Sequence, residues 1–145
     1  MAHPDLEAVL NAALPFAQQM LAKHGEFYPF GAKMTVAGEI IDVGAQLEGD
    51  DHPASQPLID VMTQAFRADA SAGKIRAVGI CYDVRAIPPG QTEKTDAICV
   101  GLEHSAGDCV SVFVPYKKGW LGKIKYGQLF ASQRDPQIFT SGGAA

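Results

Sequence analysis

The sequence predicts an α+β fold, a two-layer domain in which an antiparallel sheet of about five to six strands carries two helices on one face. Two segments place apolar residues at the three- and four-residue spacing of helices, and the later segments alternate residue types as strands do. The resulting order, α-β-β-α-β-β-β-β, lacks the regular β-α alternation of a parallel sheet, so we expect antiparallel strands.

The first helix is expected from Asp5 to about His24. Asp5 is placed to cap its start and Gly25 to end it. Pro15 removes a backbone donor inside this segment, which predicts a kink or a break near Leu14. The apolar face consists of Leu6, Val9, Leu10, Ala13, Ala17, Met20 and Leu21.

A β-hairpin is expected next, with Gly38 as the turn between residues 30–36 and 39–47. Residues 48–55 are rich in turn formers and predict a surface loop. Ser55 is a plausible cap for the second helix, and Gly73 closes that helix. Its expected buried face is Leu58, Ile59, Met62, Ala65 and Phe66.

Four strands are expected in the second half, at residues 75–87, 95–104, 109–116 and 123–130. The first two share one design. Each places large apolar residues on one face and mostly small residues on the other, such as Ala77, Gly79 and Cys81 in the first. We expect the small-residue face to admit a close helix.

Composition predicts one globular domain over residues 1–140 and a disordered tail at 141–145. The chain has 145 residues, 47% of them hydrophobic and 19% charged, with a net charge of −4. Residues 1–72 hold ten acidic and three basic side chains, for a charge of −7, whereas residues 73–145 hold six acidic and nine basic ones, for +3. No apolar run has the roughly 20 residues that cross a bilayer, so we expect no membrane association.

The three cysteines, Cys81, Cys99 and Cys109, show neither C-x-x-C spacing nor an even disulfide framework. A reducing cytoplasm is the simplest location for them. A metal site formed by the cysteines with His104 is conceivable, but small residues that alternate in strands more often belong to the core. We therefore expect no metal and no cofactor.

The sequence contains none of the common local motifs of phosphate loops, dinucleotide sites, zinc proteases, calcium loops or serine hydrolases. A catalytic site made from scattered residues remains open. The best set is Asp83, Arg85, Asp96, Glu103 and His104, on or beside the strands at 75–87 and 95–104. A histidine beside carboxylates can perform acid–base catalysis. Alternatively, these charges only pair with their neighbours across the strands.

Residues 116–126 combine four lysines with three aromatic residues, a composition also found on surfaces that bind single-stranded nucleic acid. An ordinary hairpin explains it as well, because Lys123 and Lys125 alternate with Ile124, and the acidic chain makes nucleic acid an unfavourable partner. Trp120 and Leu121 form an apolar pair in a glycine-flanked turn. If exposed, this pair favours an interface with another protein or with a second copy of the chain.

The segment from Glu26 to Ala32, E-F-Y-P-F-G-A, places three aromatic residues around Pro29. It either fills the core where helix and sheet meet or forms an aromatic pocket with Tyr28 as its polar group. Together with D-A-I at 96–98, L-E-H at 102–104, V-P-Y at 114–116 and Y-G at 126–127, this segment resembles a group of small uncharacterised bacterial proteins. The resemblance covers residues 24–131 and implies no activity.

Two functional hypotheses follow. The first is a non-enzymatic bacterial protein, an accessory or immunity-like factor that binds another protein or its own copy through Trp120 and Leu121. The second is an enzyme or small-molecule-binding protein that uses Asp83, Arg85, Glu103 and His104, all grouped on the sheet. The two differ in whether these polar groups converge in a pocket or Trp120 lies on an exposed apolar surface.

Overall fold

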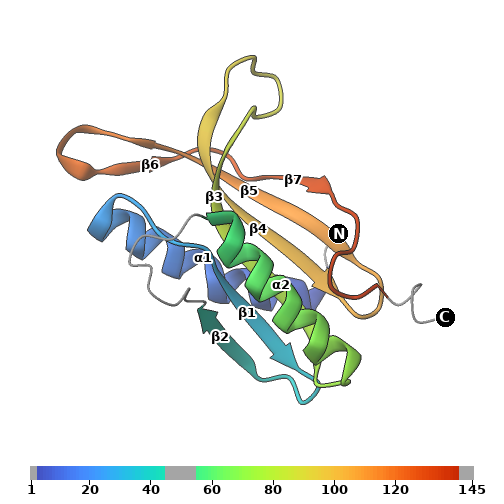
Figure 1. Ribbon diagram of the computed structural model, residues 1–145. Coiled ribbons are helices and arrows are strands. Elements are labelled where there is room, and N and C mark those ends of the chain that lie inside the picture. The colour runs from blue at the N-terminus through green and yellow to red at the C-terminus, as the bar shows by residue number, and fades with distance from the viewer. Residues whose placement is uncertain (1–2, 45–54, 141–145) are drawn as a thin grey trace.

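The computed structural model describes residues 3–44 and 55–140, and it confirms the α+β class, the antiparallel sheet and the order of the elements (Figure 1). Of the last expected strand, at 123–130, only residues 124–126 form a strand, and a further short strand that the sequence did not predict begins at Phe130. The elements are α1 (Pro4–His24), β1 (Phe30–Thr35), β2 (Ile40–Gly44), α2 (Ser55–Ser71), β3 (Ile75–Ala86), β4 (Thr95–His104), β5 (Cys109–Lys118), a 3-10 turn (Trp120–Gly122), β6 (Ile124–Tyr126) and β7 (Phe130–Gln133).

The strands form one antiparallel sheet in the order β2-β1-β3-β4-β5-β6. β4 pairs with one edge of β5. The other edge is shared, because β7 pairs with its first half, Val110–Phe113, and β6 with its last residues, Tyr116–Lys118. The end of β5 and the whole of β6 therefore continue past the body of the sheet as a projecting hairpin (Figure 1).

The expectation of two helices on one face is wrong, because α1 and α2 cover opposite faces of the sheet (Figure 1). In β3, Ala77 and Cys81 belong to the core under α1, whereas Val78 and Ile80 belong to the core under α2. Successive strand residues point to opposite faces, so β3 is buried on both sides. The domain consequently has three layers, helix, sheet and helix.

The small residues of β3 do admit a close helix, as expected. A Cβ added to Gly79 would lie 2.8 Å from Cγ1 of Val9 in α1 and 3.1 Å from Cδ2 of Leu102 in β4. The small faces of β3 and β4 lie on opposite sides, however, because Gly79 pairs with Leu102 and Ile80 with Gly101. Each strand thus supplies large side chains where its neighbour supplies small ones.

Helix α1 differs from expectation at two positions. It runs without a break through Pro15, which lies on the exposed face, where water can bind the carbonyl that loses its partner. Its cap is His3 rather than Asp5, because the Nδ1 atom of His3 accepts a hydrogen bond from the Asp5 backbone at 3.0 Å. Gly25 ends the helix in the left-handed conformation, as expected.

The hairpin turn at Gly38 is confirmed, with a φ of 95°, and Gly73 follows α2 with a φ of 69°. The predicted end of the second hairpin strand, most of the loop at 48–55 and the tail at 141–145 lie outside the described residues. Among the described residues, neither helix has the length and apolar character needed to cross a membrane.

Candidate interaction site

The four polar residues proposed as a catalytic set do not converge. Asp83 and Arg85 lie near one end of β3, whereas His104 pairs with Ala77, six residues away along β3, or roughly 20 Å at strand spacing. Glu103 pairs with Val78 and therefore lies on the α2 face, opposite to the face of His104. The sheet separates these groups into three places.

Glu103 fastens the C-terminal segment, residues 134–139, to the sheet. Its side chain is only 1% exposed. Oε2 accepts a hydrogen bond from Nη2 of Arg134 at 2.7 Å, and Oε1 accepts backbone N–H groups of Gln137 at 2.9 Å and Ile138 at 2.8 Å. The guanidinium group of Arg134 lies against Gly101, where a side chain would collide with it. Both carboxylate oxygens of Glu103 accept hydrogen bonds from this segment, which indicates a structural role.

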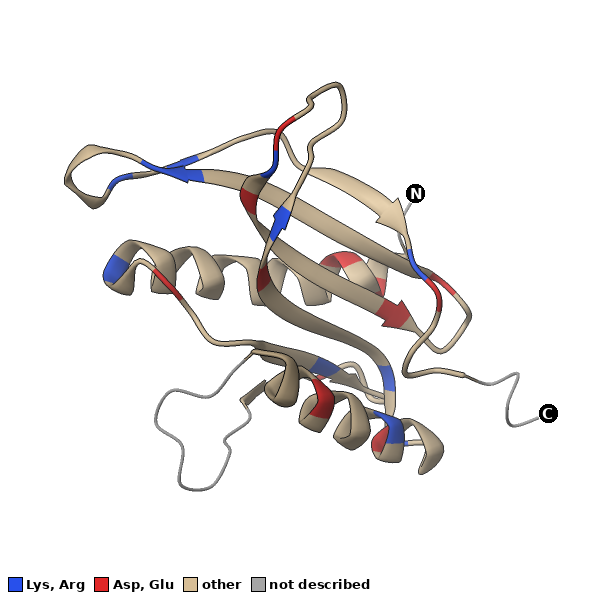
Figure 2. Cartoon of the chain, turned by 45° about the horizontal axis from the view of Figure 1, so that its top comes forward, with Lys and Arg blue, Asp and Glu red and all other residues tan. Residues whose placement is uncertain are grey.

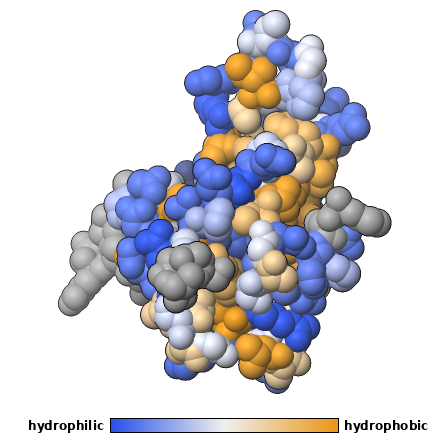
Figure 3. Space-filling view, turned by 90° about the vertical axis from the view of Figure 1, so that its right-hand side faces the viewer, coloured by the Kyte–Doolittle hydropathy of each residue, from blue (hydrophilic) through white to orange (hydrophobic). Residues whose placement is uncertain are grey.

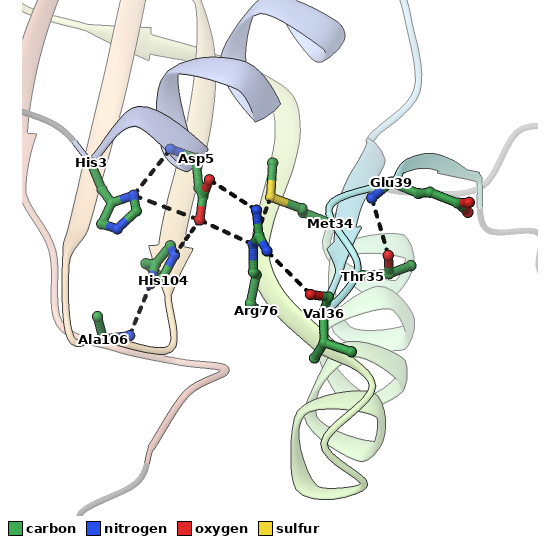
Figure 4. Close-up of polar contacts among 9 residues, drawn as sticks. All are labelled: His3, Asp5, Met34, Thr35, Val36, Glu39, Arg76, His104 and Ala106. Carbon is green, nitrogen blue, oxygen red and sulfur yellow. Dashed lines mark hydrogen bonds and ion pairs between the residues drawn. The ribbon is translucent and has the colours of Figure 1, made fainter.

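His104 belongs to a second cluster, at the start of α1 (Figure 4). Its Nε2 lies 2.8 Å from Oδ2 of Asp5, and Nε of Arg76 lies 3.1 Å from the same oxygen. The ring of His3 stacks on that of His104 with centroids 3.9 Å apart. The hydrogen bond with His104, together with the charge of Arg76, lowers the pKa of Asp5 below its ordinary value despite its burial. Asp5 thereby ties α1 to β3 and β4.

The same cluster could hold a metal ion, because the ligand atoms of three described side chains, His3, Asp5 and His104, lie within 4.8 Å of one another. The sequence alone did not identify this set. The hydrogen bonds favour the structural role. Nδ1 of His104 accepts the Ala106 N–H at 2.9 Å, so the neutral ring carries its proton on Nε2, the atom that faces Asp5. The guanidinium group of Arg76 beside the carboxylate would also repel a cation.

Asp83 and Tyr116 form a third polar group, on the α1 face. The Tyr116 hydroxyl donates to Oδ1 of Asp83 at 2.8 Å. Burial raises the pKa of Asp83 above its ordinary value, against this hydrogen bond, and the negative charge of Asp96 adds to the rise. Arg85 is the cross-strand partner of Asp96. This arrangement fits the cross-strand pairing of charges that the sequence left open.

The aromatic segment before β1 mainly fills the core. Phe27 and Phe30 are each 8% exposed and lie in the cluster under α1. Tyr28, the suggested polar group of a pocket, is 43% exposed.

The hairpin that joins β5 and β6 carries the most exposed large apolar side chains of the described residues. We call residues 116–126 the arm. Trp120 and Leu121 at its tip are 84% and 83% exposed. The turn is closed by backbone hydrogen bonds between Gly119 and Lys123 at 2.6 Å and between Lys123 and Trp120 at 3.3 Å. The tip therefore presents the indole and the leucine side chain outward on an ordered turn.

Leu121 has a φ of 61°, and among the described residues it is the one non-glycine residue with a positive φ. A left-handed backbone costs a residue with a side chain about 1–2 kcal/mol. The turn thus holds an exposed leucine where glycine would be less strained. Strain of this kind at an exposed position is often associated with function.

The arm is also the most basic part of the chain. It contains four lysines and no acidic residue, and Figure 2 shows these lysines on the projecting hairpin. Lys117 on β5 is directly opposite Lys125 on β6. Like charges in this position destabilise a pair of strands. Neither lysine forms an ion pair within residues 3–44 or 55–140.

A cavity of about 430 Å³ opens at the base of the arm, between the β3–β4 loop and the strands β5, β6 and β7. Pro88, Pro89, Pro115 and Leu129 supply apolar walls, and Lys117 and Lys125 line it as well. None of the described residues that line it is acidic. The volume lies in the range of sites that bind small molecules or single side chains.

A larger cavity, of about 600 Å³, lies between α2 and the C-terminal segment. Its charged lining residues are of both signs, with Arg67 and Arg134 against Asp60 and Asp135. The guanidinium group of Arg134 is already paired with Glu103, and Nε of Arg67 donates to the Gln137 carbonyl at 2.6 Å. This cavity therefore has no clear preference for the charge of a ligand.

Comparisons of the chain with protein-family models, with curated proteins and with solved structures find no match.

Proposed function

We propose that this chain is a non-enzymatic accessory protein that binds another protein through the tip of its arm. The observation that carries the proposal is the exposure of Trp120 and Leu121, at 84% and 83%, on a projecting hairpin. Tryptophan is the residue most enriched among those that dominate the energy of interfaces. Adjacent apolar side chains that are both exposed are a feature of surfaces that bind other proteins.

The charge of the arm supports a partner with an acidic surface. Four lysines surround the apolar tip without one acidic residue. They would steer a negatively charged partner toward the tip and would repel the arm of a second copy. An immunity-like role, in which a small protein covers the working surface of another, is one function of this type.

We also propose a bacterial cytoplasmic location. The free cysteines Cys81, Cys99 and Cys109 support it, because reduced thiols are usual in that compartment. The alternative function, an enzyme or small-molecule-binding protein that uses Asp83, Arg85, Glu103 and His104, has less support. Its four side chains occupy three separate places in the fold, and Asp83, Glu103 and His104 each hydrogen-bond to a structural partner.

The experiment is quantitative affinity purification from cells of the source organism, with wild-type protein and the variant Trp120→Ala/Leu121→Ala as baits. The matched control is Val61→Ser, which removes an exposed apolar side chain, 43% exposed, from α2. We expect a protein that the wild type and Val61→Ser retain and the arm variant loses. Identical sets of retained proteins for all three baits would contradict the proposal.

A further inference from the structure

The cavity at the base of the arm shows which chemistry a partner must bring. Its walls combine apolar side chains of Pro88, Pro115 and Leu129 with the two lysines Lys117 and Lys125. Apolar surface extends below the β3–β4 hairpin on the side of the molecule shown in Figure 3, where that hairpin projects at the top. The site thus offers an apolar contact and a positive charge side by side.

Two lysines of the cavity wall stand opposite each other on the two strands of the arm. Lys117 and Lys125 are cross-strand partners and lie on one face of the arm, the face to which Pro115 also belongs. A lysine on β6 can be explained as protection of an edge strand against wrong pairing. Lys117 lies beyond the pairing of β5 with β4 and so has an open edge too, but edge protection does not require the two lysines to stand directly opposite each other, where like charges destabilise the pair.

An anionic group between the two ammonium groups would remove their repulsion and accept hydrogen bonds from both. A carboxylate is the anionic group that proteins carry, and two charge-assisted hydrogen bonds would orient it. The neighbouring apolar walls would then hold a side chain close to that carboxylate along the same peptide. Because the described residues of the cavity wall include no acidic side chain, none of them competes for the lysines.

We propose that this cavity binds an acidic segment of the partner protein, with an Asp or Glu carboxylate between Lys117 and Lys125 and an adjacent apolar side chain against Pro88 and Leu129. The inference rests on the proposed function, since it names the chemistry of the partner that the arm tip recognises. It adds a second contact, at the base of the arm, that has its own residues and its own test.

The test begins with a library of short random peptides displayed on phage, selected on the wild-type protein. Recovered peptides are then synthesised, and their binding is measured by fluorescence anisotropy. We expect them to combine Asp or Glu with an apolar residue and to bind more weakly as salt increases. Lys117→Gln/Lys125→Gln should weaken binding by about tenfold or more, because two charge-assisted hydrogen bonds are lost.

The matched control is Lys118→Gln/Lys123→Gln, which removes the same two charges from the arm outside the cavity and should change binding by only about twofold. Recovery of no peptide, recovery of peptides without an acidic excess, or equal loss in the control would overturn the inference. So would binding of the wild type, but not of Lys117→Gln/Lys125→Gln, to phosphatidylserine vesicles. A dimer that Lys117→Gln/Lys125→Gln abolishes would overturn it too, and would assign the cavity to a second copy.

The two proposals fail in different ways. A partner that is lost with Trp120→Ala/Leu121→Ala but retained by Lys117→Gln/Lys125→Gln would refute the acidic segment and leave the proposed function intact. Acidic peptides that require the two lysines, in a protein for which no partner depends on Trp120, would refute the proposed function and leave the cavity as a peptide-binding site.

Discussion

Replacement of Glu103 by Ala should detach the C-terminal segment from the sheet. The substitution leaves the charge of Arg134 without its partner at 2.7 Å and removes the acceptor of the Gln137 and Ile138 N–H groups at 2.9 and 2.8 Å. Loss of one member of a buried ion pair costs about 3–5 kcal/mol. Release of Ile138, 4% exposed, from the core under α2 would cost about 1.5–3 kcal/mol. The segment therefore leaves the sheet if the cost of the unpaired Arg134 charge exceeds the cost of exposing Ile138.

The free energy of unfolding in urea should therefore fall by about 1.5–3 kcal/mol, limited by the cost of releasing Ile138. Hydrogen exchange should show loss of protection at residues 137 and 138. The variant Glu103→Gln keeps one oxygen for these N–H groups but turns its amide N–H₂ toward Arg134, so it should lose stability as well. Arg134→Met in the same chain should restore part of that loss, because the opposing donor is gone. Unchanged exchange at 137 and 138 in Glu103→Ala would refute this account of Glu103.

Further substitutions test the packing and electrostatics. Gly79→Ala should destabilise the fold by about 1–3 kcal/mol in urea unfolding, because its Cβ would lie 2.8 Å from a valine of α1. Gly44→Ala should have little effect, because no atom of the described residues lies within 4 Å of the added Cβ. Asp5 has a lowered pKa in the folded state, so its carboxylate stabilises the fold at neutral pH, and this stabilisation is lost as the pH falls below the ordinary pKa of 3.8. Asp5→Asn should remove this pH dependence from the acid-unfolding profile. Asp83 has a raised pKa, so the folded state binds its proton more tightly than the unfolded state does, and the ionised carboxylate destabilises the fold at neutral pH. Asp83→Asn should therefore raise the thermal unfolding temperature at neutral pH but not in acid. Lys125→Glu should raise stability by about 0.2–1 kcal/mol at low salt, because it replaces a like-charge cross-strand pair by an opposite one, and should abolish binding of acidic peptides.

Much of the fold could be predicted from the sequence, because each element carries its own pattern. Alternation in β3 and β4 identified both strands, and Gly25, Gly38 and Gly73 marked ends and turns correctly. The side on which each helix lies could not be derived this way. It depends on the register of β3 with β4, which places the small residues of one strand beside the large residues of the other.

The candidate sites show the same limit. Glu103 and His104 are neighbours in one strand and therefore point to opposite faces, a fact that alternation alone already implies. The contact of His104 with Asp5 joins residues 99 positions apart, so no local pattern announces it. Trp120 and Leu121, by contrast, were identified from their glycine-flanked turn, and their exposure was the property left for the structure to decide.

The most direct test of the central claim is photocrosslinking in cells of the source organism, with a photoreactive amino acid in place of Trp120. A matched protein carries the same group in place of Val61. We predict one discrete adduct with a different protein from position 120 and none of that mass from position 61. Absence of any adduct at position 120, or the same adducts from both positions, would contradict the claim that the tip of the arm binds a partner.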